Sequence, residues 1–332
     1  MYNTFFGVTK APFNLTPDPD FLYLTAQHRE ALAGLSYAIF ARKGFVVLTG
    51  TAGTGKTTLL TRIIGHLPAP RVQYSVILNP TLSPAEFLEA AMMDFGINDV
   101  PASKAQRISK LQDFLWKAHQ AGQISALIVD EAHTLSLEVL EEIRLLGNFE
   151  SASEKFLQIA LVGQCELDDL LNSAHLWQLK QRIARRMTIT PLSAEDVGPY
   201  IQYRWKIAGG KEAPFSAEAV AGIGQATHGI PRLINVTCDN ALIEAFADES
   251  AMVEARHVIG VCRDLHLTAP VPHLSPPIPQ RASAPPALAS VPALDAYPMK
   301  TLERYSTAPA RRPSMLGRLR AKFKSTPRTE IA

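Results

Sequence analysis

Residues 48–60 read LTGTAGTGKTTLL, and within them the pattern G-x-x-x-x-G-K-[ST] of a phosphate-binding loop runs from Gly50 to Thr57. Glycines in such a loop let backbone N–H groups turn inward around a polyphosphate, where a Cβ would clash. The loop follows a short apolar run at 45–48 that predicts a buried strand, and it precedes a segment at 57–64 that predicts a helix. Strand, loop and helix therefore occur in the order that the motif requires, which disfavours an accidental glycine-rich turn.

The side chains of this loop have separate predicted roles. We expect Lys56 to reach the β- and γ-phosphates and the Thr57 hydroxyl to bind Mg²⁺. The helix that begins here would point its positive dipole end at the anion. The candidate nucleotide-binding residues of the loop are Gly50, Thr51, Ala52, Gly53, Thr54, Gly55, Lys56, Thr57 and Thr58.

Two carboxylates follow a second apolar run, residues 126–129. Such a run predicts a central strand, and ligands bind at the carboxyl ends of the strands in open parallel sheets. We expect Asp130 to hold the magnesium and Glu131 to polarise the attacking water. Residues 130–133 spell DEAH, as in some helicases, but the chain has no other helicase motif, so His133 is left without a role.

Composition separates a body from a tail. The chain has 332 residues, 47% hydrophobic, and residues 268–332 hold ten basic and three acidic residues and half of the 24 prolines. The body is mildly acidic, and its size suffices for a large core. We expect no signal peptide and no membrane-spanning helix, and three cysteines without metal-ligand spacing predict reduced thiols in the cytoplasm.

The pattern predicts five parts along the chain. The first large part is predicted to have an α/β fold, and the second to consist of helices. The five parts are an aromatic and proline-rich arm (1–24), an α/β core (25–191), a lid of four helices (192–267), a disordered linker (268–310) and a basic tail (311–332). The arm packs either on an adenine ring or on its own domain. Ser103 and Gln106 resemble a capping box, and His28 either contacts the nucleotide or lies on the surface.

For several basic side chains, the sequence allows more than one role. Residues 179–186 hold arginines that form either a solvated face or a contact with the γ-phosphate of a neighbouring subunit. Arg232, at the start of a lid helix, is a candidate for nucleotide contact. The basic tail, with apolar residues between its charges, is typical of segments that bind an anionic membrane surface, nucleic acid or an acidic partner, and a solvated tail is the alternative.

The order of these motifs resembles the AAA+ ATPases of the ExeA type (general secretion pathway protein A), including shorter ATPases of pilus biogenesis and of exosortase-linked polysaccharide export. The resemblance covers about residues 1–267. Its segments are FFG at 5–7, LTPDP at 15–19, HREAL at 28–32, the phosphate-binding loop, VDEAH at 129–133, LVGQ at 161–164 and GIPR at 229–232.

The resemblance implies further site residues. Asn79 matches a polar switch that restrains the catalytic Glu, and Gln164 lies where sensor 1 is found, although Asn or Thr is commoner there. Arg182 matches the arginine-finger region, with Arg185 and Arg186 as competitors, and Arg232 matches sensor 2. A finger that acts in trans implies a homo-oligomer, and six-membered rings are common in the superfamily.

The predicted fold is thus a P-loop AAA+ core with a parallel sheet, an all-helical lid and a disordered tail. The predicted activity is Mg²⁺-dependent hydrolysis of ATP to ADP and phosphate. It would serve a secretion, pilus or polysaccharide-export assembly, from the cytoplasm or the inner-membrane surface. The alternatives are a DNA-associated ATPase of the transposition-regulator type and a slow nucleotide-dependent switch. One departure stands out: ExeA-type proteins continue through a membrane helix into a peptidoglycan-binding domain, and this sequence shows neither.

Overall fold

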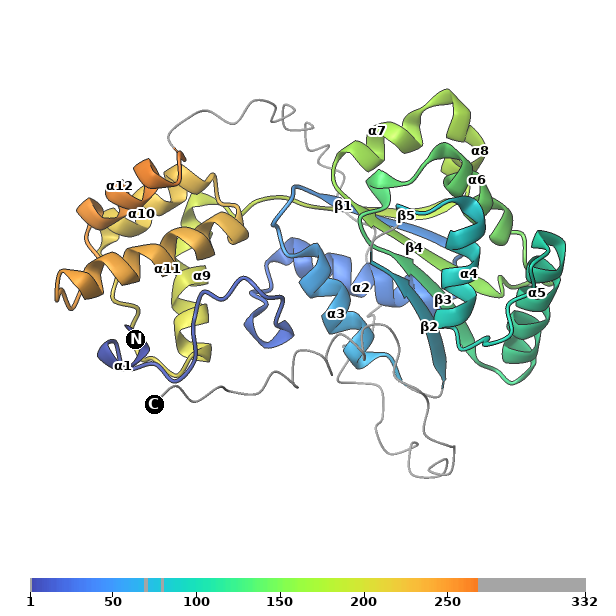
Figure 1. The fold of residues 1–332 in the computed structure, drawn as a ribbon, viewed down its shortest axis with the longest axis horizontal. Helices are drawn as coiled ribbons and strands as arrows, with labels where there is room; N and C mark the ends of the chain where they lie inside the picture. The colour runs from blue at the N-terminus through green and yellow to red at the C-terminus, as the bar shows by residue number, and fades with distance from the viewer. Residues whose placement is uncertain (1, 69–70, 79–80, 268–332) are drawn as a thin grey trace, which may run out of the picture. The chain divides into compact units, whose positions relative to one another are not determined.

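Five parallel strands form the sheet of the computed structural model, which describes residues 2–68, 71–78 and 81–267. The strands lie in the order β2-β3-β4-β1-β5, and each neighbouring pair is parallel (Figure 1). The predicted α/β fold with a parallel sheet is therefore confirmed. The strands are β1 (Phe45–Gly50), β2 (Val72–Ile77), β3 (Ile124–Val129), β4 (Leu157–Gly163) and β5 (Ile183–Ile189).

The three central strands are more deeply buried than the edge strand β5. Every residue of β1, β3 and β4 is buried, as expected for central strands covered on both faces. In β5, at one edge of the sheet, exposed residues alternate with less exposed ones over most of the strand, whereas β2 at the other edge is almost wholly buried. The predicted edge strand at 187–189 is correct in kind but begins earlier, at Ile183, so that Arg185 and Arg186 belong to it.

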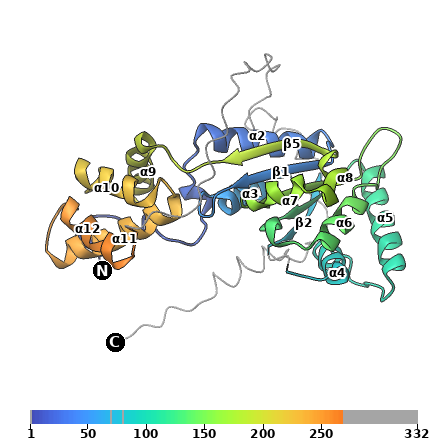
Figure 2. The same ribbon diagram turned by 90° about the horizontal axis from the view of Figure 1, so that it is seen from above.

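Helices cover both faces of the sheet. Phe45 and Val47 of β1 face one core cluster and Val46 and Leu48 the other, as the period of two in a strand requires. The helices α2 and α3 pack on one face and α4 to α8 on the other (Figure 2). Their bounds are α2 (Ala26–Phe40), α3 (Lys56–His66), α4 (Pro84–Asp94), α5 (Lys104–Gln120), α6 (Leu137–Leu146), α7 (Glu166–Asn172) and α8 (Trp177–Lys180), with short 3₁₀ turns η1 (Pro19–Phe21), η2 (Ala132–Thr134) and η3 (Ala174–Leu176).

The starts of α4 and α5 show that a sequence pattern alone does not predict a capping box. At α4, Ser83 and Glu86 form a reciprocal capping box. At α5, the predicted box is wrong: among the described residues, the Ser103 side chain caps no backbone N–H. A serine in the right place is thus not sufficient, because its rotamer must also point back to the helix start.

Four helices after β5 form a second core together with the N-terminal arm. They are α9 (Ala194–Ile207), α10 (Ala217–Thr227), α11 (Pro231–Ala247) and α12 (Ala255–Asp264). Trp205 of α9 is 1% exposed in this core, and Val8, Phe13 and Phe21 of the arm pack with it. The short helix α1 (Tyr2–Phe5) contacts α11.

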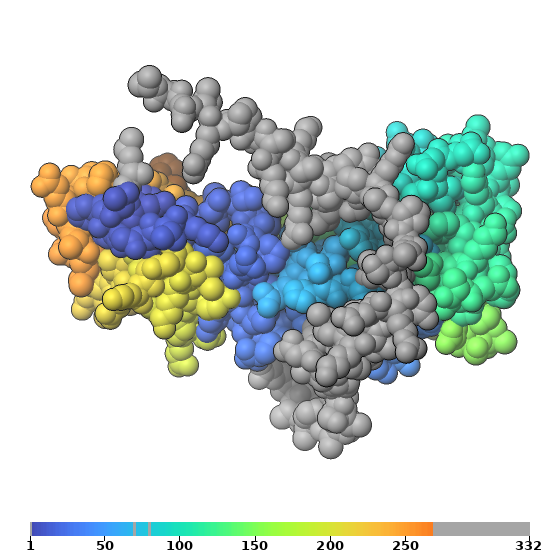
Figure 3. Space-filling model, turned by 90° about the horizontal axis from the view of Figure 1, so that it is seen from below, coloured from blue at the N-terminus to red at the C-terminus, as the bar shows by residue number. Residues whose placement is uncertain are grey.

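The arm packs on the lid of its own chain, which was one of the two predicted alternatives (Figure 3). The buried Arg204 side chain of α9 donates hydrogen bonds to the carbonyls of Pro12 at 2.7 Å and Asn14 at 3.2 Å. The backbone N–H of Thr9 donates to the carbonyl of Ala208 at 2.8 Å. Proline-rich backbone lacks the partners of a helix or sheet, and these contacts supply them.

Two predicted features lie outside the described residues: Asn79, and the linker and basic tail over 268–332. Of the helices within the described ranges, none has the length and hydrophobicity needed to cross a bilayer.

Candidate nucleotide-binding site

The phosphate-binding loop connects β1 to α3, and its glycines are required by close approaches and backbone angles. A Cβ on Gly50 would lie 2.4 Å from the carbonyl oxygen of Ile189 in β5. Gly53 and Gly55 have φ values of 80° and 96°, in the region that favours glycine. The loop therefore keeps a shape in which its N–H groups are available at the start of α3.

The Lys56 side chain folds back onto the phosphate-binding loop. The Lys56 ammonium donates to the carbonyls of Gly50 at 2.7 Å and Thr51 at 3.0 Å. The side chain is 5% exposed, and burial lowers its pKa, while the carboxylates of Glu131 and Asp130 oppose that shift. A buried ammonium beside an open loop is a strong attractor for an anion.

The two carboxylates follow β3, next to the loop. Asp130 is 2% exposed, and its Oδ2 accepts a hydrogen bond from the Thr57 hydroxyl at 2.7 Å. Burial raises the pKa of Asp130, while hydrogen bonds from Thr57 and from the backbone N–H of Glu131 oppose that shift. Glu131 has a φ of 52°, which is uncommon for a residue with a Cβ, and lines the cleft described below.

The Thr57 and Asp130 oxygens fit a magnesium ion. Mg²⁺ prefers hard oxygen ligands and keeps several waters and phosphate oxygens, so a hydroxyl and one carboxylate suffice on the protein side.

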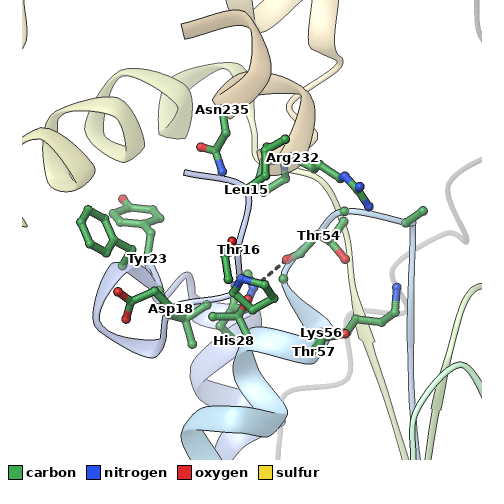
Figure 4. A pocket seen from close by; sticks show the side chains of 18 of the residues that line it. Leu15, Thr16, Asp18, Tyr23, His28, Thr54, Lys56, Thr57, Arg232 and Asn235 are labelled. Carbon is green, nitrogen blue, oxygen red and sulfur yellow. Dashed lines mark hydrogen bonds between the residues drawn. The ribbon is translucent and has the colours of Figure 1, made fainter. Parts of the chain in front are cut away.

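A cleft of about 400 Å³ opens above the loop. Its walls come from the arm, the phosphate-binding loop and the lid (Figure 4), with His28 of α2, Glu131 and Gln164 as further lining residues. Arg232, at the start of α11, lines it, and its backbone N–H donates to the Gly53 carbonyl at 3.2 Å. The loop and the lid are thus joined at the predicted sensor 2 position.

Comparison with known proteins agrees with this geometry. Residues 41–171 match the family model described as AAA domain. General secretion pathway protein A of Aeromonas hydrophila is 41% identical over 248 residues, which cover 74% of this chain and 45% of that protein. The chain thus spans less than half of the relative's length.

The chain is an AAA-domain protein related to general secretion pathway protein A.

Solved structures agree on the fold. The ORC2 protein of Aeropyrum pernix, in its ADPNP-ADP complexes, has a TM-score of 0.58 at 14% identity, with 77% of this chain and 71% of that chain covered. The Drosophila ORC bound to DNA has a TM-score of 0.59 at 19% identity, with 77% and 64% covered. At such identities the likeness extends to the AAA+ fold alone.

His28 is not a surface residue of this AAA domain. Its side chain is 3% exposed, with Nε2 at 3.1 Å from the carbonyl of Thr54 and Nδ1 at 2.7 Å from the Thr25 hydroxyl. Because a carbonyl only accepts, the Nε2 atom carries the proton. Burial lowers the pKa of His28, and the Thr54 carbonyl opposes this. Of the two predicted alternatives, the surface position is wrong: His28 is buried, ties α2 to the loop and lines the cleft.

A polar cluster on the lid was not predicted from the sequence. The Tyr200 hydroxyl donates to Asn235 Oδ1 at 2.8 Å and accepts from Arg204 Nη1 at 3.2 Å, and all three side chains line the cleft. Arg204 also lies 5.0 Å from the centre of the Phe21 ring. Arg204 follows Tyr200 by four positions and Asn235 follows Arg204 by 31, so no local sequence motif identifies the cluster.

The candidate arginine fingers lie away from this cleft. Arg182 donates to the carbonyl of Arg144 at 3.1 Å, just before β5 begins. Arg185 pairs with Glu30 and Arg186 with Asp168, each at 3.1 Å. Of the described residues, none of these three arginines lines the cleft of its own chain. The prediction that Arg182 acts in a neighbouring subunit remains a prediction.

Gln164 follows β4 and lines the cleft, where it contacts His133. Its amide nitrogen lies 3.1 Å from His133 Nε2. His133 of the DEAH sequence, to which no role was assigned from the sequence, thus contacts a residue that lines the cleft.

Proposed function

We propose that this chain hydrolyses ATP to ADP and phosphate in a Mg²⁺-dependent reaction. The contact that carries the proposal is the hydrogen bond of 2.7 Å from the Thr57 hydroxyl to Asp130. It joins the phosphate-binding loop to the carboxylate at the end of β3, next to Glu131. A metal held there would neutralise phosphate charge as the reaction proceeds.

The loop binds and orients the polyphosphate. The Lys56 ammonium now donates to two loop carbonyls, and a bound triphosphate offers it stronger, charged acceptors. Because the ammonium is already buried, this exchange occurs in a low-dielectric site where charge contacts are strong. The N–H groups at the start of α3 complete the cradle.

Glu131 orients the attacking water. Its carboxylate faces the cleft from the residue after Asp130, and it accepts a proton of that water by hydrogen bonding as the γ-phosphoryl group is transferred. Asp130 is held by Thr57 and by the Glu131 N–H, which makes it the fixed member of the pair.

The lid and a second subunit supply the remaining charges. Arg232 contacts the nucleotide within the chain, and Arg182 reaches the nucleotide of a neighbour, so full activity requires a homo-oligomer. The position of Arg182, outside its own cleft, supports this division.

We place the activity in a secretion, pilus or polysaccharide-export assembly, at the cytoplasmic side of an inner membrane. The relation to general secretion pathway protein A supports this setting. In this scheme hydrolysis drives conformational change in the assembly through movement of the lid.

Glu131→Gln tests the proposal. We expect the wild type to release phosphate from ATP with Mg²⁺, and the variant to bind a fluorescent ATP analogue normally while turnover falls by about 10²-fold or more. A variant that cannot bind ATP would show that Glu131 is a structural carboxylate. Assays with duplex DNA and with anionic vesicles set the biological context, since stimulation by DNA alone would favour a DNA-associated ATPase.

A further inference from the structure

His133 lies between Gln164, which lines the cleft after β4, and Glu131, which is proposed to orient the attacking water. It belongs to η2, directly after β3, and β4 ends beside it at Gly163. A Cβ on Gly163 would lie 3.1 Å from the backbone nitrogen of His133, so the glycine permits this approach. The approach places Gln164 against the imidazole.

The imidazole contacts both neighbours through its two nitrogens. His133 Nδ1 lies 3.4 Å from Glu131 Oε2, and His133 Nε2 lies 3.1 Å from Gln164 Nε2. The backbone N–H of Gln164 also points at Nδ1, at 3.4 Å. The His133 side chain is 15% exposed, so water competes little for these contacts.

These contacts cannot all be made at once. With the proton on Nδ1, the ring offers a donor to Glu131 Oε2, 3.4 Å away, and Nε2 accepts from the Gln164 amide. With the proton on Nε2, Nδ1 accepts from the Gln164 backbone N–H, and Glu131 loses its donor. Within the described part of the chain, Glu131 Oε2 is buried and has no hydrogen bond of good geometry, so His133 is the group placed to orient it.

We propose that His133 is a positioning residue that couples Gln164 to Glu131. The proposal rests on the proposed ATPase function. When a γ-phosphate accepts a hydrogen bond from the Gln164 side-chain amide, the hydrogen bonds of His133 change from one ring nitrogen to the other. Because Nδ1 faces Glu131, this change alters the orientation of the Glu131 carboxylate. Phosphate contact and water activation are thereby linked through one ring.

Kinetics of the full-length protein test this coupling. We expect His133→Ala to lower kcat by about 10-fold to 100-fold, because the carboxylate loses its orientation, while ATP affinity stays within twofold of wild type. His133→Asn keeps a donor near Nδ1 and should retain more turnover than His133→Gln, which keeps only the reach toward Gln164. His66→Ala is the control, since His66 is exposed and contacts only the Arg62 carbonyl among the described hydrogen bonds.

A double variant separates coupling from independent effects. Gln164→Ala should lower kcat like His133→Ala, and the double variant should lose no more than either single one. Losses that multiply would overturn the proposal. So would turnover within twofold of wild type in His133→Ala, or a parallel fall of affinity and melting temperature, which would indicate a merely structural ring.

A spectroscopic measurement does not depend on turnover. In protein labelled with ¹⁵N-histidine, the His133 ring signals, assigned with His133→Ala, should shift when a non-hydrolysable ATP analogue is added, and they should not shift in Gln164→Ala. Unchanged signals in the wild type with bound analogue would overturn the inference. If wild type binds ATP but never hydrolyses it, the proposed function fails, and this measurement alone decides the coupling.

Discussion

The two sides of the cleft are built in different ways. On the phosphate side, residues 50–58 are contiguous and two carboxylates follow a single strand. On the arm and lid side, Tyr200, Arg204 and Asn235 come from α9 and α11 and meet the arm residues near Asn14. One side is a local motif, and the other exists only when distant segments fold together.

The difference predicts which property each side controls. Lys56 and Thr57 are held by loop carbonyls and by Asp130, and their polar groups are poised for a ligand. Arg204 instead donates to Tyr200 and to two carbonyls of the arm, and so joins segments that are distant in the sequence. Changes on the phosphate side should therefore reduce activity, whereas changes on the arm and lid side should first reduce stability.

The largest expected effect is that of Lys56→Ala, which tests the phosphate side of the cleft. We expect ATPase kcat/KM to fall by about 10²–10³-fold, because the variant removes the ammonium that is predicted to contact the phosphates. The melting temperature should change little, because the variant also removes a costly buried charge. Phosphate release and thermal melts measure both, with the exposed Lys110→Ala as control. Near-normal hydrolysis would overturn the site assignment.

Arg204→Ala should have the opposite profile. It removes hydrogen bonds to two arm carbonyls and to Tyr200, and we expect a loss of about 3 kcal/mol in the free energy of unfolding. Urea denaturation measures it, and Arg256→Ala, an exposed lid arginine with surface ion pairs, should cost about 0.5 kcal/mol or less. Equal effects of the two would show that the arm is not clamped by Arg204.

Tyr200→Phe removes a single hydroxyl from the same cluster. Because this leaves the buried Asn235 carbonyl oxygen without its donor, we expect a cost of about 1–2 kcal/mol. Tyr37→Phe is the matched control, since Tyr37 is 48% exposed. A loss of nucleotide affinity without a loss of stability would instead assign the cluster to ligand binding.

The smallest expected effect concerns pH and His28, which joins α2 to the loop. Burial lowers its pKa in the folded state, so below about pH 6.5 the unfolded chain binds more protons than the folded one. Stability should therefore rise with pH through the window between the folded pKa and 6.5, by at most about 1.4 kcal/mol per pH unit, and be lost as pH falls. Urea midpoints of wild type and His28→Gln between pH 5 and 7.5 measure this; identical pH dependence would contradict it.

Prediction from the sequence succeeded where a pattern is local. The phosphate-binding loop, the buried strands and the four lid helices each have a signal within a few residues. It left His28 open between two alternatives because its environment comes from Thr54, 26 positions away. It failed for Ser103, whose side chain caps no backbone N–H among the described residues. His133 had a recognisable spelling, but its partner Gln164 lies 31 positions further along the chain.

The sequence by itself determined the phosphate side of this protein: a glycine-rich loop, its lysine and threonine, and two carboxylates after a strand. The reason is that backbone geometry and charge there are set by neighbours in the chain. Only the tertiary structure decided that the arm covers the lid, that Arg204 holds it, and that His133 joins Glu131 to Gln164. Those contacts depend on which strands are adjacent and which side chains become buried together, and no short stretch of sequence encodes that.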